Sequence, residues 1–188
     1  MPDTIQVAVI VGSLRKESVS RKAALALAKL APAHLNLNIV EIGDLPLYNE
    51  DVEAAGVPES WQRFRDALRG SDAVLFITPE YNRSVPGALK NAIDVGSRPY
   101  GASAWSGKPA AIMSLSPGAL GAFGANHHLR QSLVFLDMPI LQQPEAYVGN
   151  AFSLFDDKGE LVSDGTKDFF KSLMDRFANL IERASPKA

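Results

Sequence analysis

A short segment rich in hydroxyl groups and positive charge, GSLRKESVSR at residues 12–21, is the first place where this sequence could do chemistry. It follows a run of β-branched residues and precedes a helical pattern, so main-chain N–H groups and the positive end of a helix would face one point. Ser13, Ser18 and Ser20 add hydroxyl donors and Arg15 adds a guanidinium, and both kinds of group bind phosphate. The alternative is that Ser18 or Ser20 only caps the helix. The segment lacks the G-x-G-x-x-G fingerprint of dinucleotide sites and the Gly-Lys-Ser/Thr end of a Walker loop, which favours a mononucleotide phosphate.

A second segment, TPEYNRSVPG at residues 78–87, places an aromatic ring beside an amide. Two prolines stiffen it, and Tyr81 next to Asn82 offers a flat apolar surface together with a hydrogen-bond donor and acceptor. A planar heteroaromatic ligand needs that combination of surface and directional polar groups. The competing interpretation is an ordinary strand-to-helix turn, with Pro86 near the start of the helix.

A third segment, SLSPGALGAFG at residues 114–124, carries Gly118, Gly121 and Gly124. Glycines let the main chain approach a ligand closely, although glycine-rich connections without a ligand are common. The three segments together predict more than each alone, because one suits a phosphate, one the face of a ring and one the edge of a ring.

Alternating strands and helices must position these segments. Apolar β-branched runs predict buried strands at 5–11, 37–42, 73–78 and 109–115, and a fifth, interrupted strand formed by 139–141 and 146–148. Helical spacing and prolines predict helices from about residue 20 to before Pro32, over 58–68, from Pro86 through Ile93, through 129–136, and over 166–183. Such alternation forms parallel βαβ units, so the expected fold is an α/β doubly wound five-stranded parallel sheet with helices on both faces. Ligands of such sheets bind beyond the carboxyl ends of the strands, where the three segments would meet.

Composition and charge narrow the function. The chain has no cysteine, which excludes disulfides, thiolate catalysis and sulfur-ligated metals, and its three histidines lack metal-ligand spacing. The net charge of −2 argues against nucleic-acid binding, and no apolar stretch reaches the length of a membrane span. Residues 1–4 lack the basic and apolar parts of a signal peptide. We therefore expect a cytoplasmic protein of one domain, residues 1–188, that binds neither nucleic acid nor membrane.

The first two segments carry a family resemblance. GSLRKESVSR resembles the G-S-x-R-x-x-S-x-N phosphate loop of the NADPH-dependent FMN reductase family, and TPEYNRSVPGALKNAID resembles its flavin-ring loop. This family is flavodoxin-like and includes bacterial chromate and quinone reductases; the similarity extends from residue 7 to about residue 148. Ser20 stands where the family commonly has asparagine. The resemblance implies that the FMN phosphate is held by Ser13, Arg15 and Ser20, and that the isoalloxazine is lined by Pro79, Glu80, Tyr81 and Asn82, with Ser116 and Gly118 on its other side.

The resemblance also implies an activity and an assembly. The activity is FMN-dependent NAD(P)H oxidoreduction, a ping-pong hydride transfer from NADPH or NADH through FMN to a quinone or another small acceptor such as chromate, an azo compound or free flavin. The cofactor carries this chemistry, so no side chain is expected to act as a catalytic acid or base. The implied assembly is a homodimer or homotetramer.

Two other functions stay open on the sequence. One is a non-enzymatic flavodoxin-type electron carrier, although such carriers are usually strongly acidic and this chain is only mildly so. The other is a nucleotide-binding module without turnover.

Overall fold

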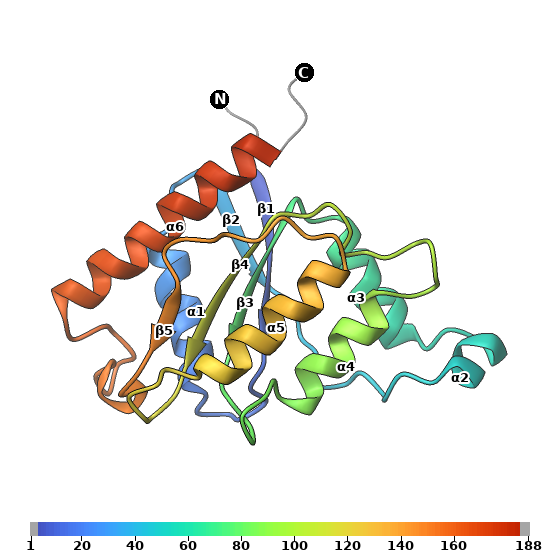
Figure 1. The fold of residues 1–188 in the computed structure, drawn as a ribbon, viewed down its shortest axis with the longest axis horizontal. Coiled ribbons are helices and arrows are strands. Elements are labelled where there is room, and N and C mark those ends of the chain that lie inside the picture. The colour runs from blue at the N-terminus through green and yellow to red at the C-terminus, as the bar shows by residue number, and fades with distance from the viewer. Residues whose placement is uncertain (1–3, 185–188) are drawn as a thin grey trace.

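Five parallel strands form one sheet at the centre of the molecule (Figure 1). In the computed structural model, which describes residues 4–184, the strand order is β2-β1-β3-β4-β5. The bounds are β1 Ile5–Val11, β2 Leu35–Ile39, β3 Ala73–Thr78, β4 Ala110–Leu115 and β5 Ala146–Val148. This is the flavodoxin-like, doubly wound order, so the predicted fold class is confirmed. The expected unit 1–188 and the N-terminal segment 1–4 extend into residues 1–3 and 185–188, which lie outside the described residues.

Helices cover both faces of the sheet. Successive residues of each strand point to opposite sides, so apolar side chains on both faces need helices to bury them. Val9 and Leu75 pack with α1 and α6 on one face, whereas Ile10 and Phe76 pack with α3, α4 and α5 on the other (Figure 1). The bounds are α1 Val19–Leu30, α2 Glu50–Ala55, α3 Glu59–Arg69, α4 Gly87–Gly96, α5 Phe123–Phe135 and α6 Asp164–Ala184. Burial on both faces explains why the central strands are continuous apolar runs.

The second strand lies earlier in the chain than predicted. The sequence pattern predicts a strand over 37–42, but β2 pairs with β1 from Ile5↔Leu35 to Val9↔Ile39 and then ends. Ile42 misled the prediction: it is buried, yet it belongs to a loop that packs on the α3 and α4 side of the sheet. An apolar residue that leaves the sheet for the core looks the same in sequence as one more strand position.

The fifth strand is interrupted, as predicted. Ala146–Val148 pairs in parallel with the carboxyl end of β4. Earlier in the chain, Ile140 forms a single parallel bridge with Ala110, the first residue of β4. The chain therefore touches this edge of the sheet twice and leaves it in between.

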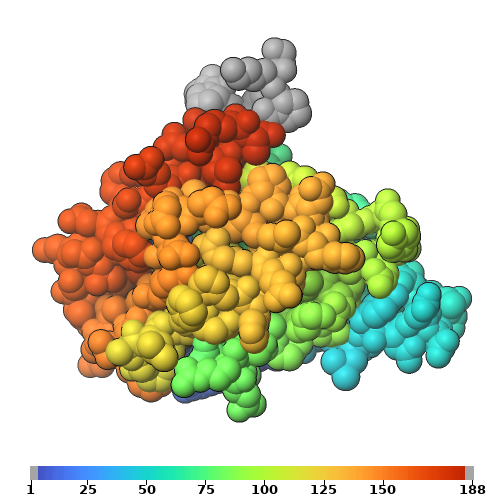
Figure 2. Space-filling model, viewed as in Figure 1, coloured from blue at the N-terminus to red at the C-terminus, as the bar shows by residue number. Residues whose placement is uncertain are grey.

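The sequence pattern does not predict α2, a short helix that projects from the body of the molecule (Figures 1 and 2). None of its residues is buried, so it lacks the apolar periodicity by which a helix is recognised. The side chain of Asn49 caps it by accepting from Asp51 N at 2.9 Å. Buried Arg65 anchors it, lying 2.7 Å from the Glu53 carboxylate and donating from Nε to Val95 O at 2.9 Å.

The last helix, α6, is long but amphipathic. Phe170, Leu173 and Phe177 on one side are buried, while Lys171 and Asp175 form an exposed pair on the other. Among the described residues no helix is both long and apolar enough to cross a membrane. Within the same residues, no group of three His, Asp or Glu side chains is placed to hold a metal ion.

Two glycines of α4 allow a matched test of this packing. A Cβ on Gly96 would lie 2.6 Å from Cε2 and Nε1 of buried Trp105, whereas a Cβ on Gly87 would meet nothing within 4 Å. We expect Gly96→Ala to cost about 1–3 kcal/mol of folding free energy by overpacking and to lower Tm by roughly 2–4 °C per kcal/mol. Gly87→Ala should keep or raise Tm. Thermal unfolding followed by circular dichroism checks both, and equal Tm values for the two variants would contradict the described contact.

Candidate functional site

The three segments singled out in the sequence meet in one pocket at the carboxyl ends of β1, β3 and β4. Its volume is about 240 Å³. It lies where the strand order reverses between β1 and β3, the usual ligand position in a doubly wound sheet. The pocket is lined by Ser13, Arg15, Ser18, Val19, Ser20, Pro79, Glu80, Tyr81, Leu115, Ser116, Pro117, Ala151 and Phe152. Of the nine predicted site residues, all but Asn82 and Gly118 are in this lining.

The first segment leaves donors free for an anion at the start of α1. Ser18 is the N-cap of the helix, and its Oγ accepts from Arg21 N at 3.1 Å. Ser20 is buried, with 4% of its surface exposed, and its hydroxyl has no hydrogen-bond partner within residues 4–184. Arg15 is exposed at the pocket and makes no ion pair with any described residue. Of the two serines considered as caps, Ser18 therefore has that role and Ser20 does not.

The second segment forms a tight hairpin turn. Tyr81 N donates to Ser84 O and Ser84 N donates to Tyr81 O, both at 3.0 Å. The central residues Asn82 and Arg83 have φ of 51° and 64°, as a type I′ turn requires. Asparagine tolerates this conformation well. The turn puts Asn82 at an exposed tip outside the pocket lining and leaves Tyr81, 47% exposed, on the wall.

The third segment is held by the chain that follows β5. Ser116 N donates to Val148 O at 3.1 Å, and Ala151 N donates to Ser116 O at 3.0 Å. Gly118 O accepts from the Ser116 hydroxyl at 3.0 Å, so this carbonyl is engaged within the loop. A Cβ on neighbouring Gly149 would lie 2.8 Å from a carbonyl oxygen of the same loop. The loop is thus packed rather than loose, with Ser116 on the pocket wall and Gly118 behind it.

Sequence reasoning missed the wall supplied after β5. Ala151 and Phe152 belong to a 3₁₀ turn, Ala151–Ser153, that begins three residues beyond the end of β5. Phe152 is 64% exposed, although its type suggests a core residue. The rule that located the other loops, the carboxyl end of a strand, would have found this one as well.

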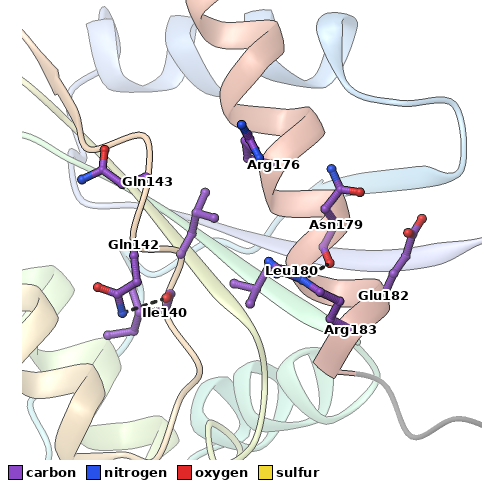
Figure 3. A pocket seen from close by; sticks show the side chains of 9 residues that line it. Ile140, Gln142, Gln143, Arg176, Asn179, Leu180, Glu182 and Arg183 are labelled. Atoms are coloured by element: carbon purple, nitrogen blue, oxygen red, sulfur yellow. Dashed lines mark hydrogen bonds between the residues drawn. The ribbon is translucent and has the colours of Figure 1, made fainter.

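A larger groove lies elsewhere and gathers none of the predicted residues (Figure 3). It has a volume of about 560 Å³ and separates residues 140–143 from the last turns of α6. Gln142 and Gln143 stand on one side and Arg176 and Asn179 on the other (Figure 3). Because Ile140 bridges the first residue of β4, the groove is at the amino end of that strand, away from the three loops.

The last cation of the first segment, Arg21, is paired with a carboxylate in the loop after β2. Arg21, one turn into α1, donates to Glu41 at 2.6 Å. This side-chain hydrogen bond, opposed by partial burial, raises the pKa of Arg21. Arg21 is therefore paired, which leaves Arg15 as the cation of the segment that faces the pocket.

Known proteins resemble this chain over the range that contains the pocket lining. The family model described as NADPH-dependent FMN reductase matches residues 5–153, a range that holds the whole pocket lining. The chain is 68% identical over 182 residues to the quinone reductase of Pseudomonas putida, covering 97% of each. It is 45% identical over 171 residues to the NAD(P)H-dependent FMN reductase of Pseudomonas aeruginosa, covering 91% of this chain and 92% of that one.

A solved structure is similar over the same length. It is FerB, a flavoenzyme NAD(P)H:(acceptor) oxidoreductase from Paracoccus denitrificans, with a TM-score of 0.90 and 44% identity. The similarity covers 96% of this chain and 98% of that chain. The similarity therefore extends over nearly the whole of both chains.

The different roles of the two buried serines can be separated by stability. We expect Ser18→Ala to destabilise the fold by about 1 kcal/mol, because it removes the cap of α1, and to lower Tm by roughly 2–4 °C. Ser20→Ala, its matched control, should keep the wild-type Tm because its hydroxyl has no hydrogen-bond partner among the described residues. Thermal unfolding without ligand checks the pair, and a larger loss for Ser20→Ala would overturn the assignment of the cap.

Proposed function

The chain belongs to the NADPH-dependent FMN reductase family, and from that premise we propose that it is an FMN-dependent NAD(P)H oxidoreductase that reduces quinones. One observation carries the proposal: a single pocket at the switch point of the sheet joins a free anion site to an aromatic wall. The relative that is 68% identical to this chain is a quinone reductase, which favours an enzyme over an electron carrier or a nucleotide-binding module without turnover.

The residues of the pocket fit FMN. At one end, Ser13, Arg15 and Ser20 surround the N-terminus of α1, where positive partial charge and unpaired donors suit the phosphate. At the other end, Pro79 and Tyr81 offer the flat apolar surface that an isoalloxazine needs. Ser116 faces them from the third segment.

Two predicted residues are proposed to act through the shape of the loops. Asn82 adopts φ of 51°, a conformation that the hairpin needs in order to place Tyr81 at the pocket. Gly118 supports Ser116 by accepting its hydroxyl. Neither belongs to the pocket lining, so neither is assigned a contact with FMN.

Bound FMN would supply the two-electron chemistry, taking a hydride from NADPH or NADH and passing the electrons to a quinone or another acceptor such as chromate, an azo compound or free flavin. The protein would bind FMN, the nicotinamide and the acceptor and orient them. Tyr81 and Phe152 line the pocket and are 47% and 64% exposed, so they stand where it opens to solvent. A nicotinamide and a quinone would use this opening in turn, as a ping-pong scheme requires.

The exposed apolar residues support a homo-oligomer. Val134 and Phe135 at the end of α5 are 68% and 86% exposed, and Leu47 before α2 is 79% exposed. Val134 and Phe135 are adjacent in the chain, and exposed apolar side chains that adjoin one another are typical of contact surfaces. We propose a homodimer or homotetramer, acting in the cytoplasm, with residues 1–188 as one FMN-binding unit. Light scattering after size exclusion gives the assembly directly.

Turnover tests the function. We expect purified protein to be yellow and to oxidise NADPH or NADH when a quinone is present, with parallel double-reciprocal lines as the quinone concentration is varied. Comparing both nicotinamides and several acceptors identifies the preferred pair. A colourless protein that fails to bind added FMN would refute the proposal, and a yellow protein without turnover would favour an electron carrier.

A matched pair of cations tests the phosphate end. Arg15 lines the pocket and adjacent Lys16, also exposed, does not. Loss of a charged hydrogen bond costs about 1.5–3 kcal/mol, so Arg15→Ala should weaken FMN binding by about tenfold or more. Lys16→Ala should bind like wild type. Quenching of FMN fluorescence on titration with flavin-free protein gives both dissociation constants, and an unchanged value for Arg15→Ala would remove this residue from the site.

A further inference from the structure

Helix α5 begins without a cap of its own. Its N-cap residue is Ala122, which has φ of 61° and no side-chain hydrogen bond to the helix. The first N–H groups of a helix have no partner within the helix and are usually satisfied by a nearby Ser, Thr, Asp or Asn. Here the partner comes from 45 residues away: Glu80 Oε2 accepts from Ala125 N at 3.1 Å.

The Glu80 carboxylate is enclosed at this position. Its side chain is 12% exposed, and its other oxygen, Oε1, accepts from Arg83 Nη1 at 3.2 Å. The Arg83 side chain is 75% exposed, and exposed ion pairs contribute little. The bond to Ala125 is therefore the main contact, and a negative charge is favourable at the positive end of a helix.

Gly124 shows how closely the hairpin and the helix approach. A Cβ there would lie 2.8 Å from Arg83 O and 2.9 Å from Glu80 Oε2. One turn further along, His128 Nδ1 lies 3.0 Å from Ser84 Oγ and forms a second tie. Both ends of the hairpin, residues 80–84, are thus attached to the first turns of α5.

The opposite wall of the pocket is attached to the same helix end. The third segment runs directly into α5, and Gly121 O in it accepts from the Ser114 hydroxyl at 2.7 Å. Asn126 of α5 donates from Nδ2 to the same hydroxyl at 3.1 Å. The start of α5 is therefore a common support for the Tyr81 wall and for the wall of Ser116.

We propose that Glu80 is a positioning residue, whose carboxylate caps α5 from the hairpin and so holds the Tyr81 wall of the pocket at a fixed place relative to the Ser116 wall. This assigns its carboxylate to the helix rather than to the flavin ring. The inference rests on the proposed function, because the ligand held between the two walls is taken to be FMN.

Glu80→Ala and Glu80→Gln separate positioning from charge. Glu80→Ala removes the cap and should raise the dissociation constant of FMN by about tenfold. Glu80→Gln keeps an oxygen that accepts from Ala125 N, so it should restore binding to within about threefold of wild type. Glu160→Ala is the control, since this glutamate pairs with Lys29 at the surface and is 56% exposed.

The readout is fluorescence titration of flavin-free protein with FMN and with riboflavin, together with visible circular dichroism of the bound flavin. If Glu80 positions the ring wall, Glu80→Ala should weaken both ligands by the same factor and alter the dichroism, whereas Arg15→Ala should weaken FMN alone. Two results would overturn the proposal: wild-type flavin affinity and dichroism in Glu80→Ala, even with a lowered Tm, or a loss in Glu80→Gln as large as in Glu80→Ala. Failure of the wild-type protein to bind FMN would refute the proposed function instead.

Discussion

β1, β3 and β4 lie side by side in parallel, and the hydrogen bonds between them set where three distant loops must begin. Parallel strands end at the same edge of a sheet, and their ends need irregular backbone that solvent or a ligand can satisfy. Gly12 shows how tight this edge is, since a Cβ there would lie 3.1 Å from Thr78 Oγ1 and 3.3 Å from Pro79 Cδ. The pocket exists because this pairing brings the ends together.

The N-termini of α1 and α5 are capped in different ways. α1 has a local cap, Ser18, whose hydroxyl accepts from Arg21 N, and within residues 4–184 the Ser20 hydroxyl has no partner. α5 is closed by the carboxylate of Glu80. Because a carboxylate already occupies the start of α5, a ligand phosphate would find more favourable charge at the start of α1 than at that of α5. This difference supports the proposed orientation, with the FMN phosphate at the start of α1.

A flavin enzyme asks little acid–base chemistry of its protein, and the architecture reflects that. The described side chains around the pocket act by shape and by hydrogen bonds to one another: the hairpin at Tyr81, the packed third segment at Ser116 and the turn that carries Phe152. Rigid walls lower the cost of ordering a bound ring. An open, aromatic entrance suits a flat acceptor such as the quinone named for the 68% identical relative.

Much of this protein could be read from local pattern, because buried strands and helix starts are determined by neighbouring residues. The strands at β1, β3 and β4 and the position of the site at their carboxyl ends follow from apolar runs, glycines and hydroxyl groups. The resemblance to the FMN reductase family implied the full set of site residues, of which seven line the pocket. α2 could not be predicted, because a helix with no buried residue leaves no periodic signal. The sequence pattern places Ile42 in a strand, because an apolar residue that is buried in a loop looks the same in sequence as one in a sheet.

Tertiary structure decided the roles of individual site residues, because these roles depend on contacts between residues far apart in the chain. The sequence by itself determined that a phosphate-type loop and an aromatic loop follow buried strands. Only the fold decided that Ser18 rather than Ser20 caps α1, that Asn82 points to the tip of its turn, and that Phe152 completes the wall. It also gave Glu80 a partner 45 residues away, because the cap of α5 is supplied by whichever polar group packing brings to it.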